Sequence, residues 1–332
     1  MDFVKDMLSK AKTLQKQLVL PEGTEPRTIK AARIIADDRL ASNVVLVGKK
    51  SEIQKVADQE GVSLDGLDLV DPSVSSDLEK YATEYYELRK HKGMTLDQAK
   101  IDMASPLRWG AMMVRLGDAD GMVAGAEHTT ADVLRAGLAI IGTVPGLKTA
   151  SSCFVMQTAS PEWGVDGAMI FSDCAVVPDP NAEQLAEIAL SAAQSCREFL
   201  DAEPAVAMLS FSTKGSGGDH PNVLKVKEAF EIVKSRDSSL KIDGELQADA
   251  ALVPSVTDKK SPGSPIKGIT NTLVFPDLGS GNIGYKLVQR LGKAEAFGPF
   301  LQGFAKPISD LSRGASVEDI VVTSAVTLAR AK

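Results

Sequence analysis

The stretch Ala168–Ser212, AMIFSDCAVVPDPNAEQLAEIALSAAQSCREFLDAEPAVAMLSFS, decides the fold class. The apolar runs Ala168–Val176 and Ala205–Ser212 have the length and composition of buried strands. The segment between them, Ala182–Leu200, has the apolar spacing of an amphipathic helix. Its spaced apolar residues are Leu185, Ile188, Ala189, Ala192, Cys196 and Phe199. A strand, a helix and a second strand in succession are typical of an α/β fold with parallel strands.

The same alternation continues on both sides of this stretch. Further apolar runs that predict strands are Gln17–Pro21, Asn43–Gly48, Asp120–Gly125, Ser151–Thr158, Thr272–Pro276 and Phe300–Phe304. Because helical segments lie between these runs, we expect an α/β fold with largely parallel sheets throughout.

Two breaks in the alternation predict the domain organisation. Glycine and proline interrupt the pattern around residues 143–151 and again at Ala296–Pro299. We therefore expect residues 1–147 and 299–332 to form domain I, and residues 148–298 to form an inserted domain II.

The composition excludes several classes of protein. Of 332 residues, 44% are hydrophobic and 24% are charged, which is typical of a globular protein. Aromatic residues make up 5% and the net charge is −7, so neither base stacking nor a basic surface indicates nucleic-acid binding. The net charge repels anions, so an anionic substrate would need a local cluster of Arg and Lys.

The cysteines and the N-terminus indicate the compartment. The three cysteines, Cys153, Cys174 and Cys196, lack the spacing of a disulfide framework or a zinc site. Residues 1–20 lack the apolar core of a signal peptide, and no apolar run approaches the ~20 residues of a membrane span. We expect a cytoplasmic protein with no membrane partner, no metal and no tightly bound cofactor.

Residues 303–320, GFAKPISDLSRGASVEDI, combine a glycine-containing loop with a helix start. Ser316 and Asp319 have the spacing of a capping box, which predicts that a helix begins after Ser316. Free N–H groups at a helix start favour an anion, and Arg313 offers a planar guanidinium for phosphate or an oxyanion. Asp319 is therefore a helix cap, a base beside a bound anion, or both, because a cap needs only one carboxylate oxygen.

This string resembles the closing signature of the phosphate acetyltransferases. Other strings that fit this family lie in order along nearly the whole chain. They are Tyr86–Gly93, Leu116–Val123, Ala207–Ser216, Asp243–Gln247 and Phe275–Ile283. The resemblance implies two α/β domains similar to those of isocitrate and isopropylmalate dehydrogenases, with an active-site cleft between the domains.

The resemblance implies reversible acetyl transfer, in which acetyl-CoA and phosphate give coenzyme A and acetyl phosphate. By motif match, Asp319 would take the thiol proton when the thiolate attacks directly in a ternary complex. Arg313 would bind acetyl phosphate and stabilise its carbonyl oxygen, and Ser312 would hydrogen-bond to the transition state. Moving a proton from a thiol of pKa ~8.5 to an Asp of pKa ~3.9 is uphill by about 6 kcal/mol in water. The mechanism therefore needs desolvation of Asp319 on domain closure, a thiolate stabilised by Arg313, or proton transfer concerted with attack.

The resemblance also implies that Arg89 and Arg135 bind the substrate coenzyme A. Arg89 lies in a basic run that a solvated helix end would equally explain. Arg135 lies beyond Thr129 and Thr130, in a segment after a predicted strand, where α/β proteins place ligands. We expect both threonines to be candidate donors to phosphate oxygens. Relatives usually show Arg-Pro where this chain has Arg135-Ala136, a change that bears on the helix start and leaves the guanidinium in place.

Residues 279–284, GSGNIG, match the dinucleotide-binding motif literally. That motif expects an acidic residue ~20 positions later, at the end of a second strand. Glu295 instead continues the helical pattern, so we favour an anion-accepting helix start. Its expected contacts to phosphate or acetyl phosphate are Asn282, Tyr285 and Lys286.

Several alternatives stay open. A butyryltransferase or another short-chain acyltransferase would differ in its acyl pocket. An oxidoreductase of similar fold would need acidic metal ligands and a nicotinamide site, whereas a non-catalytic coenzyme A-binding protein would not need Ser312, Arg313 and Asp319. A covalent route through Cys174 would need a nearby base. The resemblance further implies a homodimer, with acetate kinase as the metabolic neighbour.

Overall fold

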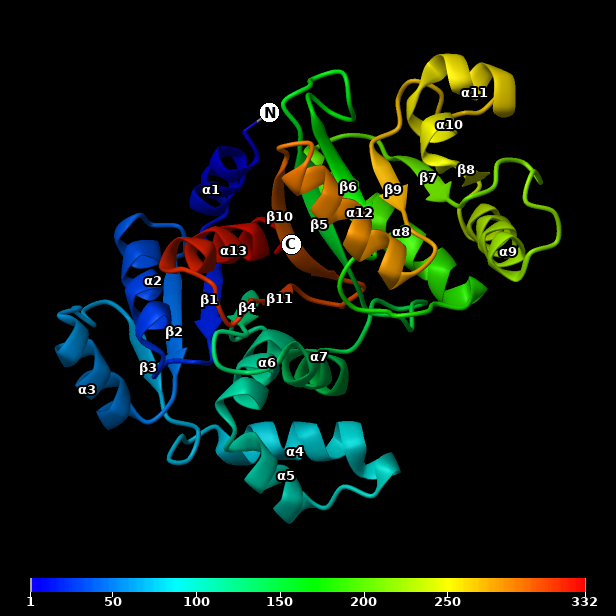
Figure 1. Ribbon diagram of the computed structural model, residues 1–332. Helices are drawn as coiled ribbons and strands as arrows, with labels where there is room; N and C mark the ends of the chain where they lie inside the picture. The colour runs from blue at the N-terminus through cyan, green and yellow to red at the C-terminus, as the bar shows by residue number, and fades with distance from the viewer. Residues whose placement is uncertain (1, 332) are drawn as a thin grey trace. The chain divides into compact units, whose positions relative to one another are not determined.

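The computed structural model describes residues 2–331, which form two compact units (Figure 1). The terminal unit comprises Asp2–Val144 and the chain from Phe304 onward, and the central unit comprises Pro145–Gly303. The sequence places the domain limits at 147/148 and 298/299, whereas the units divide at 144/145 and 303/304.

The terminal unit is built on a five-stranded parallel sheet of order β11-β4-β1-β2-β3. Its elements are α1 (Phe3–Leu14), β1 (Gln17–Leu20), α2 (Pro26–Asp37), β2 (Asn43–Val47), α3 (Lys50–Glu60), β3 (Asp68–Val70), α4 (Leu78–Arg89), the 3₁₀ turn η1 (Lys90–Lys92), α5 (Leu96–Met103), α6 (Pro106–Leu116), β4 (Gly121–Ala124), α7 (Thr130–Ala136), the π-helical turn η2 (Gly137–Ile141), β11 (Ile308–Asp310) and α13 (Val317–Ala329).

Parallel pairing places the carboxyl ends of β11, β4 and β1 next to one another at one edge of this sheet. The strands are buried apolar runs, and Leu18, Leu20 and Leu46 pack with Ile29 of α2 and Ile320 of α13 in one core. The segments that leave β1, β4 and β11 carry the polar residues of the candidate site. A parallel α/β sheet places ligands at this edge.

The central unit contains a six-stranded mixed sheet of order β10-β5-β6-β9-β7-β8. Strand β5 pairs antiparallel with β6 and β10, and the other pairs are parallel. Its elements are β5 (Ser151–Gln157), β6 (Ala168–Ser172), α8 (Ala182–Leu200), β7 (Ala205–Leu209), α9 (Pro221–Arg236), β8 (Lys241–Leu246), α10 (Ala248–Leu252), α11 (Pro254–Lys260), β9 (Thr272–Val274), α12 (Leu278–Arg290) and β10 (Glu295–Gln302).

The structure confirms the α/β fold and the largely parallel sheets. The stretch Ala168–Ser212 forms β6, α8 and β7, and both strands run parallel to β9, which lies between them. Helix α8 begins after Asn181, whose side chain forms a capping box with Gln184, and it ends at the predicted Leu200. The predicted strands are present, but most end one to four residues earlier than the apolar runs do.

The prediction that Glu295 continues the preceding helix is wrong, whereas the predicted strand Phe300–Phe304 overlaps the end of β10. Glu295 starts strand β10, which pairs with β5 as far as Gln302, so it does not continue the preceding helix. Phe297 and Phe300 favour a strand, and the break at Gly298–Pro299 is a register shift within an edge strand, where proline is tolerated. In the sheet β5 and β6 lie between β10 and β9, so residues 279–284 do not join two adjacent parallel strands as they would in a dinucleotide-binding unit.

Candidate active site

Ser312 and Arg313 lie on a turn between β11 and α13, and both are exposed. The backbone N–H of Ala315 donates to the carbonyl of Ser312 at 2.9 Å, and Gly314 N–H donates to Ser312 Oγ at 3.3 Å. We call residues 312–315 the 312–315 turn. It brings Ser312 and Arg313 to the edge of the sheet where β11 ends.

Asp319 forms the capping box that the sequence predicts. Ser316 is the N-cap of α13, and its Oγ accepts from the Asp319 N–H at 3.1 Å. Asp319 Oδ2 accepts from both the N–H and the hydroxyl of Ser316 at 2.8 Å. Both of these bonds use Oδ2, so the capping box does not engage Oδ1 of this exposed carboxylate.

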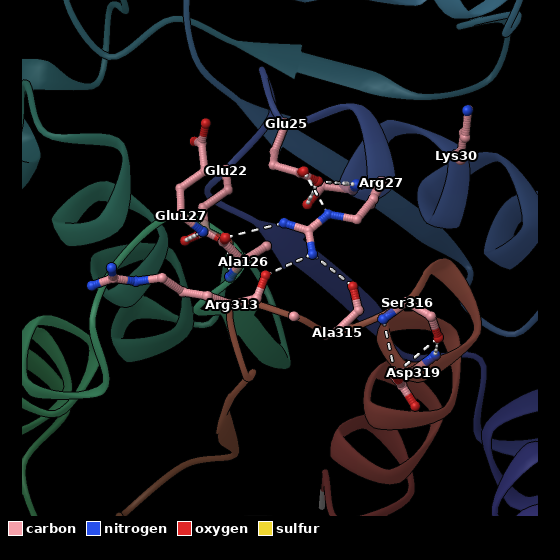
Figure 2. A network of polar contacts seen from close by, with 12 residues as sticks. Glu22, Glu25, Arg27, Lys30, Ala126, Glu127, Arg313, Ala315, Ser316 and Asp319 are labelled. Atoms are coloured by element: carbon pink, nitrogen blue, oxygen red, sulfur yellow. Dashed lines mark hydrogen bonds and ion pairs between the residues drawn. The ribbon is translucent and has the colours of Figure 1, made fainter.

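Arg313 and Asp319 lie on one short segment but point in different directions. Figure 2 shows the Arg313 side chain extending away from Ala315, on the opposite side from the start of α13 where Asp319 lies. Within residues 2–331, no ion pair joins these two side chains. The structure therefore brings the backbone of the three predicted catalytic residues together without a contact between Arg313 and Asp319.

The loop after β4 is organised by a buried glutamate that the sequence analysis missed. Glu22 follows β1, and its carboxylate accepts from the N–H groups of Gly125, Ala126, Glu127 and His128 at 2.8–3.0 Å. It also lies 2.9 Å from His128 Nδ1. Burial alone would raise the pKa of Glu22, but the hydrogen bonds from His128 and the backbone hold it below its usual value. The hydrogen bond with Glu22 in turn raises the pKa of His128.

Thr129 and Thr130 donate to carboxylates of the protein. Thr129 is the N-cap of α7, and its hydroxyl donates to Asp132 at 2.7 Å. The Thr130 hydroxyl donates to Asp310 Oδ2 at 2.5 Å. Burial raises the pKa of Asp310 to about 6, against the opposing effect of the Thr130 hydrogen bond. Both hydroxyls that we expected to face phosphate are therefore engaged within the terminal unit.

A cavity of about 510 Å³ in the terminal unit gathers Arg89 and Arg135. Its lining includes Arg89, Lys92, Arg108, Arg135, Asp132 and His128. Four of these side chains, the three arginines and Lys92, are cationic, and Asp132 is the one carboxylate among these residues. The cavity is therefore locally positive, which favours an anion although the whole chain has a net charge of −7.

The two predicted arginines differ in their surroundings. Arg89, the last residue of α4, is half-buried, and its Nε is buried without a hydrogen-bond partner among residues 2–331. Arg135 is exposed, and its Nη1 lies 2.6 Å from Asp132 Oδ1. Helix α7 starts at Thr130, well before Ala136, so the Arg-Ala pair does not lie at that helix start. The sequence analysis missed Lys92 and Arg108, which only the folded chain brings to the same cavity.

Asn282, Tyr285 and Lys286 all lie on α12 of the central unit. Asp277 caps this helix by accepting from Ser280 N–H at 2.8 Å, so a carboxylate of the protein already occupies the helix start. Asn282 donates to the carbonyl of Cys174 at 3.1 Å and accepts from Lys286 at 2.8 Å. Tyr285 stacks on Phe154 with ring centroids 4.2 Å apart, and burial raises its pKa.

The cysteines and the acidic residues offer no further site. Cys153, Cys174 and Cys196 are reduced thiols and are buried. Burial raises the pKa of Cys196 to about 11, and burial and the charge of Asp173 raise the pKa of Cys174. A thiol whose pKa is raised is a poor nucleophile. Among residues 2–331 no three His, Cys, Asp or Glu side chains are grouped as metal ligands, and no helix has the length and apolarity of a membrane span.

Comparisons with known proteins agree on one family. The sequence model described as "Phosphate acetyl/butaryl transferase" matches residues 2–328. A phosphate acetyltransferase of Treponema pallidum is 60% identical over 330 residues, which are 99% of this chain and 98% of the relative.

Solved structures agree with the sequence comparisons. A phosphotransacetylase from Streptococcus pyogenes has a TM-score of 0.92 at 41% identity, over 99% of this chain and 98% of that chain. A branched-chain phosphotransacylase from Enterococcus faecalis has a TM-score of 0.66 at 16% identity, over 96% of this chain and 100% of that chain, which shows likeness of fold alone.

Proposed function

The chain belongs to the phosphate acetyl/butyryl transferase family, and we propose that its cationic cavity and its 312–315 turn serve acetyl transfer between coenzyme A and phosphate. The enzyme is a phosphate acetyltransferase, which interconverts acetyl-CoA plus phosphate and coenzyme A plus acetyl phosphate. The observation that carries this assignment is the 60% identity over 330 residues with a phosphate acetyltransferase. Relatives that are 60% and 50% identical are phosphate acetyltransferases, so a longer acyl substrate is not favoured.

Coenzyme A, a substrate rather than a resident cofactor, binds in the cationic cavity. Arg89 and Arg135 hold its phosphate groups, because a guanidinium presents paired donors that match phosphate oxygens. Lys92 and Arg108 add charge to the same cavity, which lowers the cost of bringing a polyanion to a chain of net charge −7. The unpartnered Nε of Arg89 is a donor that such a ligand would satisfy.

Acetyl transfer proceeds by direct attack in a ternary complex. The coenzyme A sulfur forms the new bond to the acetyl carbon, the bond from that carbon to the phosphate oxygen breaks, and Asp319 takes the thiol proton. Arg313 binds the phosphate and stabilises the oxyanion, and Ser312 donates a hydrogen bond to it. Phosphate is a good leaving group, so it departs without a general acid.

The proton moves in concert with the attack. Complete transfer to an ordinary carboxylate beforehand would cost about 6 kcal/mol, whereas concerted transfer never forms the free thiolate. Oδ1 of Asp319 is the accepting atom, because Oδ2 is held by Ser316.

By resemblance to the family, Asn282, Tyr285 and Lys286 act as further contacts to the acyl phosphate, whereas the hydroxyls of Thr129 and Thr130 are held by Asp132 and Asp310. Lys286 supports this role because it is exposed on α12, where its ammonium donates to Asn282 Oδ1. The enzyme works in the cytoplasm as a homodimer, beside acetate kinase, by resemblance to the family.

A comparison of acyl phosphates tests the function. The purified enzyme is given coenzyme A with acetyl, propionyl or butyryl phosphate, and thioester formation is followed by ultraviolet absorbance. We expect kcat/KM to be highest for acetyl phosphate. If none of the three acyl phosphates gave a thioester at neutral pH, the proposed function would be wrong. A higher kcat/KM for butyryl phosphate would instead indicate a phosphate butyryltransferase.

A further inference from the structure

We propose that Arg27 is a positioning residue for acetyl transfer, which holds the backbone of the 312–315 turn so that Ser312, Arg313 and Asp319 keep their working geometry. The proposal rests on the proposed function of that turn. Arg27 contacts none of the reacting groups assigned above, so its effect on catalysis passes through the turn.

The contacts of Arg27 converge on backbone carbonyls from two loops. Nη1 donates to the carbonyl of Arg313 at 2.8 Å and to the carbonyl of Ala315 at 2.7 Å. Nη2 donates to the carbonyl of Ala126 at 3.2 Å. Figure 2 shows the guanidinium between these three carbonyls, with the turn on one side and the loop after β4 on the other. One planar group thus fixes two points of the turn.

The guanidinium is itself held in place. Its Nε lies 2.7 Å from Glu25 Oε1, and the second oxygen of Glu25 accepts from the N–H of Thr28 at 2.9 Å as the N-cap of α2. The Glu25 side chain is only 10% exposed, and that of Arg27 is 31% exposed. A carboxylate that caps α2 therefore orients the arginine toward the turn.

The position of Arg27 is unfavourable for helix α2 alone. Arg27 is the second residue of the helix, where the positive end of the helix dipole repels a cation, and the first turn contains no acidic residue. The ion pair with Glu25 at the N-cap offsets part of this repulsion. The other contacts of Arg27 are with three carbonyls of distant loops, which the helix itself does not require.

The loop on the other side provides a rigid anchor. The N–H groups of Gly125 and Ala126 are bound by Glu22, so the Ala126 carbonyl that Arg27 contacts belongs to a fixed segment. Through its guanidinium, Arg27 links this fixed segment to the carbonyls of Arg313 and Ala315. Because Ser316, which follows Ala315, caps α13, the same contacts set where the helix that carries Asp319 begins.

A double-mutant cycle in the full-length enzyme tests the proposal. The variants Arg27→Met, Arg313→Ala and the pair are assayed for thioester formation from acetyl phosphate and coenzyme A. We expect Arg27→Met to lower kcat by about 10- to 100-fold, since a displacement near 1 Å costs that much. We expect KM for coenzyme A to change by less than about threefold, because the cationic cavity lies on other elements. The pair should be slower than Arg313→Ala alone by a smaller factor than Arg27→Met is slower than wild type, because part of the effect of Arg27 passes through Arg313 and the rest through Ser312 and Asp319.

Arg33→Met is the matched control. Arg33 lies on the same helix and also joins one carboxylate, Asp37 at 2.7 Å, and one carbonyl, that of Asp65 at 2.6 Å, yet it is remote from the turn. The Arg33→Met variant should lose as much thermal stability as Arg27→Met does, while its kcat stays within about twofold of wild type. Arg27→Lys, whose ammonium cannot span three carbonyls, should fall between wild type and Arg27→Met, and it carries the test if Arg27→Met does not fold.

Two results would overturn the proposal. One is a kcat of Arg27→Met within twofold of that of Arg33→Met. The other is a double variant that shows the full product of both single losses. Inactive wild-type enzyme would instead overturn the proposed function, and hydrogen exchange of residues 311–320 would then decide the role of Arg27. Amide exchange in residues 311–320 should be about 10-fold faster in Arg27→Met than in Arg33→Met. Equal exchange rates would show that Arg27 does not fix the backbone of the 312–315 turn.

Discussion

At the scale of single residues, the capping box of α13 uses one carboxylate oxygen of Asp319. Oδ2 accepts from the N–H and the hydroxyl of Ser316, and neither bond involves Oδ1. The proposed function gives Oδ1 the thiol proton, so two different substitutions separate the capping role from the proposed catalytic role.

We predict that Ser316→Ala and Asp319→Asn have different effects. Ser316→Ala removes a cap, so it should cost about 1 kcal/mol of unfolding free energy and leave the pH–rate profile unchanged in shape. Asp319→Asn keeps an oxygen that can accept from Ser316 but cannot take a proton. It should lower kcat by about 100-fold and change the shape of the profile. Denaturant unfolding and pH-dependent initial rates measure the two effects, and identical pH–rate profiles for Asp319→Asn and wild type would leave Asp319 with the cap alone.

The residue scale also shows what sequence reasoning could reach. The Ser-x-x-Asp spacing predicts the capping box correctly because capping depends on local geometry. Arg27 and Glu22 escape prediction because their partners lie about 100 to 290 positions away in the chain. The single local signal was the cation at the second position of α2, which a search for unfavourable helix charges would have found.

At the scale of elements, Glu22 connects the end of β1 to the loop after β4. The pKa of Glu22 is lowered and that of His128 is raised. A lowered carboxyl pKa contributes stability above the unfolded value near ~4.5, and it is lost as pH falls through the folded pKa. A raised histidine pKa contributes stability below ~6.5, and it is lost as pH rises through the folded pKa. The pair therefore stabilises most between about pH 4.5 and 6.5.

We predict that Glu22→Gln moves the His128 pKa down toward the ordinary value near ~6.5, because the hydrogen bond to a carboxylate is its largest upward influence. The chain has three histidines, so NMR titration can follow each of them, and His91 and His220 serve as internal references. The thermal stability lost in Glu22→Gln should be greatest near pH 6. A His128 titration identical to that of wild type would contradict the assigned pairing.

Prediction of elements succeeded where local pattern and tertiary context agree. Helix α8 is long, capped and periodic, so its limits match. The three-residue strands β3 and β11 and the polar strand β8 were not predicted, because pairing with neighbours rather than apolar pattern makes them strands. Glu295 was assigned to a helix because the sequence does not show that residues 295–302 pair with β5.

At the scale of the whole molecule, the central unit has the features of an inserted domain. Ser151 at the start of β5 pairs with Gln302 at the end of β10, so the chain enters and leaves this unit side by side. Phe300 and Leu301 are each 2% exposed, and the Phe300 ring lies 5.1 Å from that of Phe199. The last residues of β10 are therefore part of the core of the central unit.

We predict that residues 145–303 fold alone, whereas residues 148–298 do not. The shorter fragment lacks Phe300 and Leu301. Loss of each buried side chain would lower the free energy of unfolding by about 2–3 kcal/mol. Circular dichroism during thermal unfolding should show a cooperative transition for the longer fragment and none for the shorter. Equal stability of the two fragments would contradict the role of β10 in closing this unit.

The central claim is that the 312–315 turn performs acetyl transfer, and turnover of Arg313→Ala tests it most directly. The measurement is kcat for thioester formation from saturating acetyl phosphate and coenzyme A, beside wild type and Arg33→Met. Loss of an oxyanion donor should lower kcat by more than about 100-fold, with kcat of Arg33→Met within twofold of wild type. Turnover of Arg313→Ala within threefold of wild type would contradict the claim.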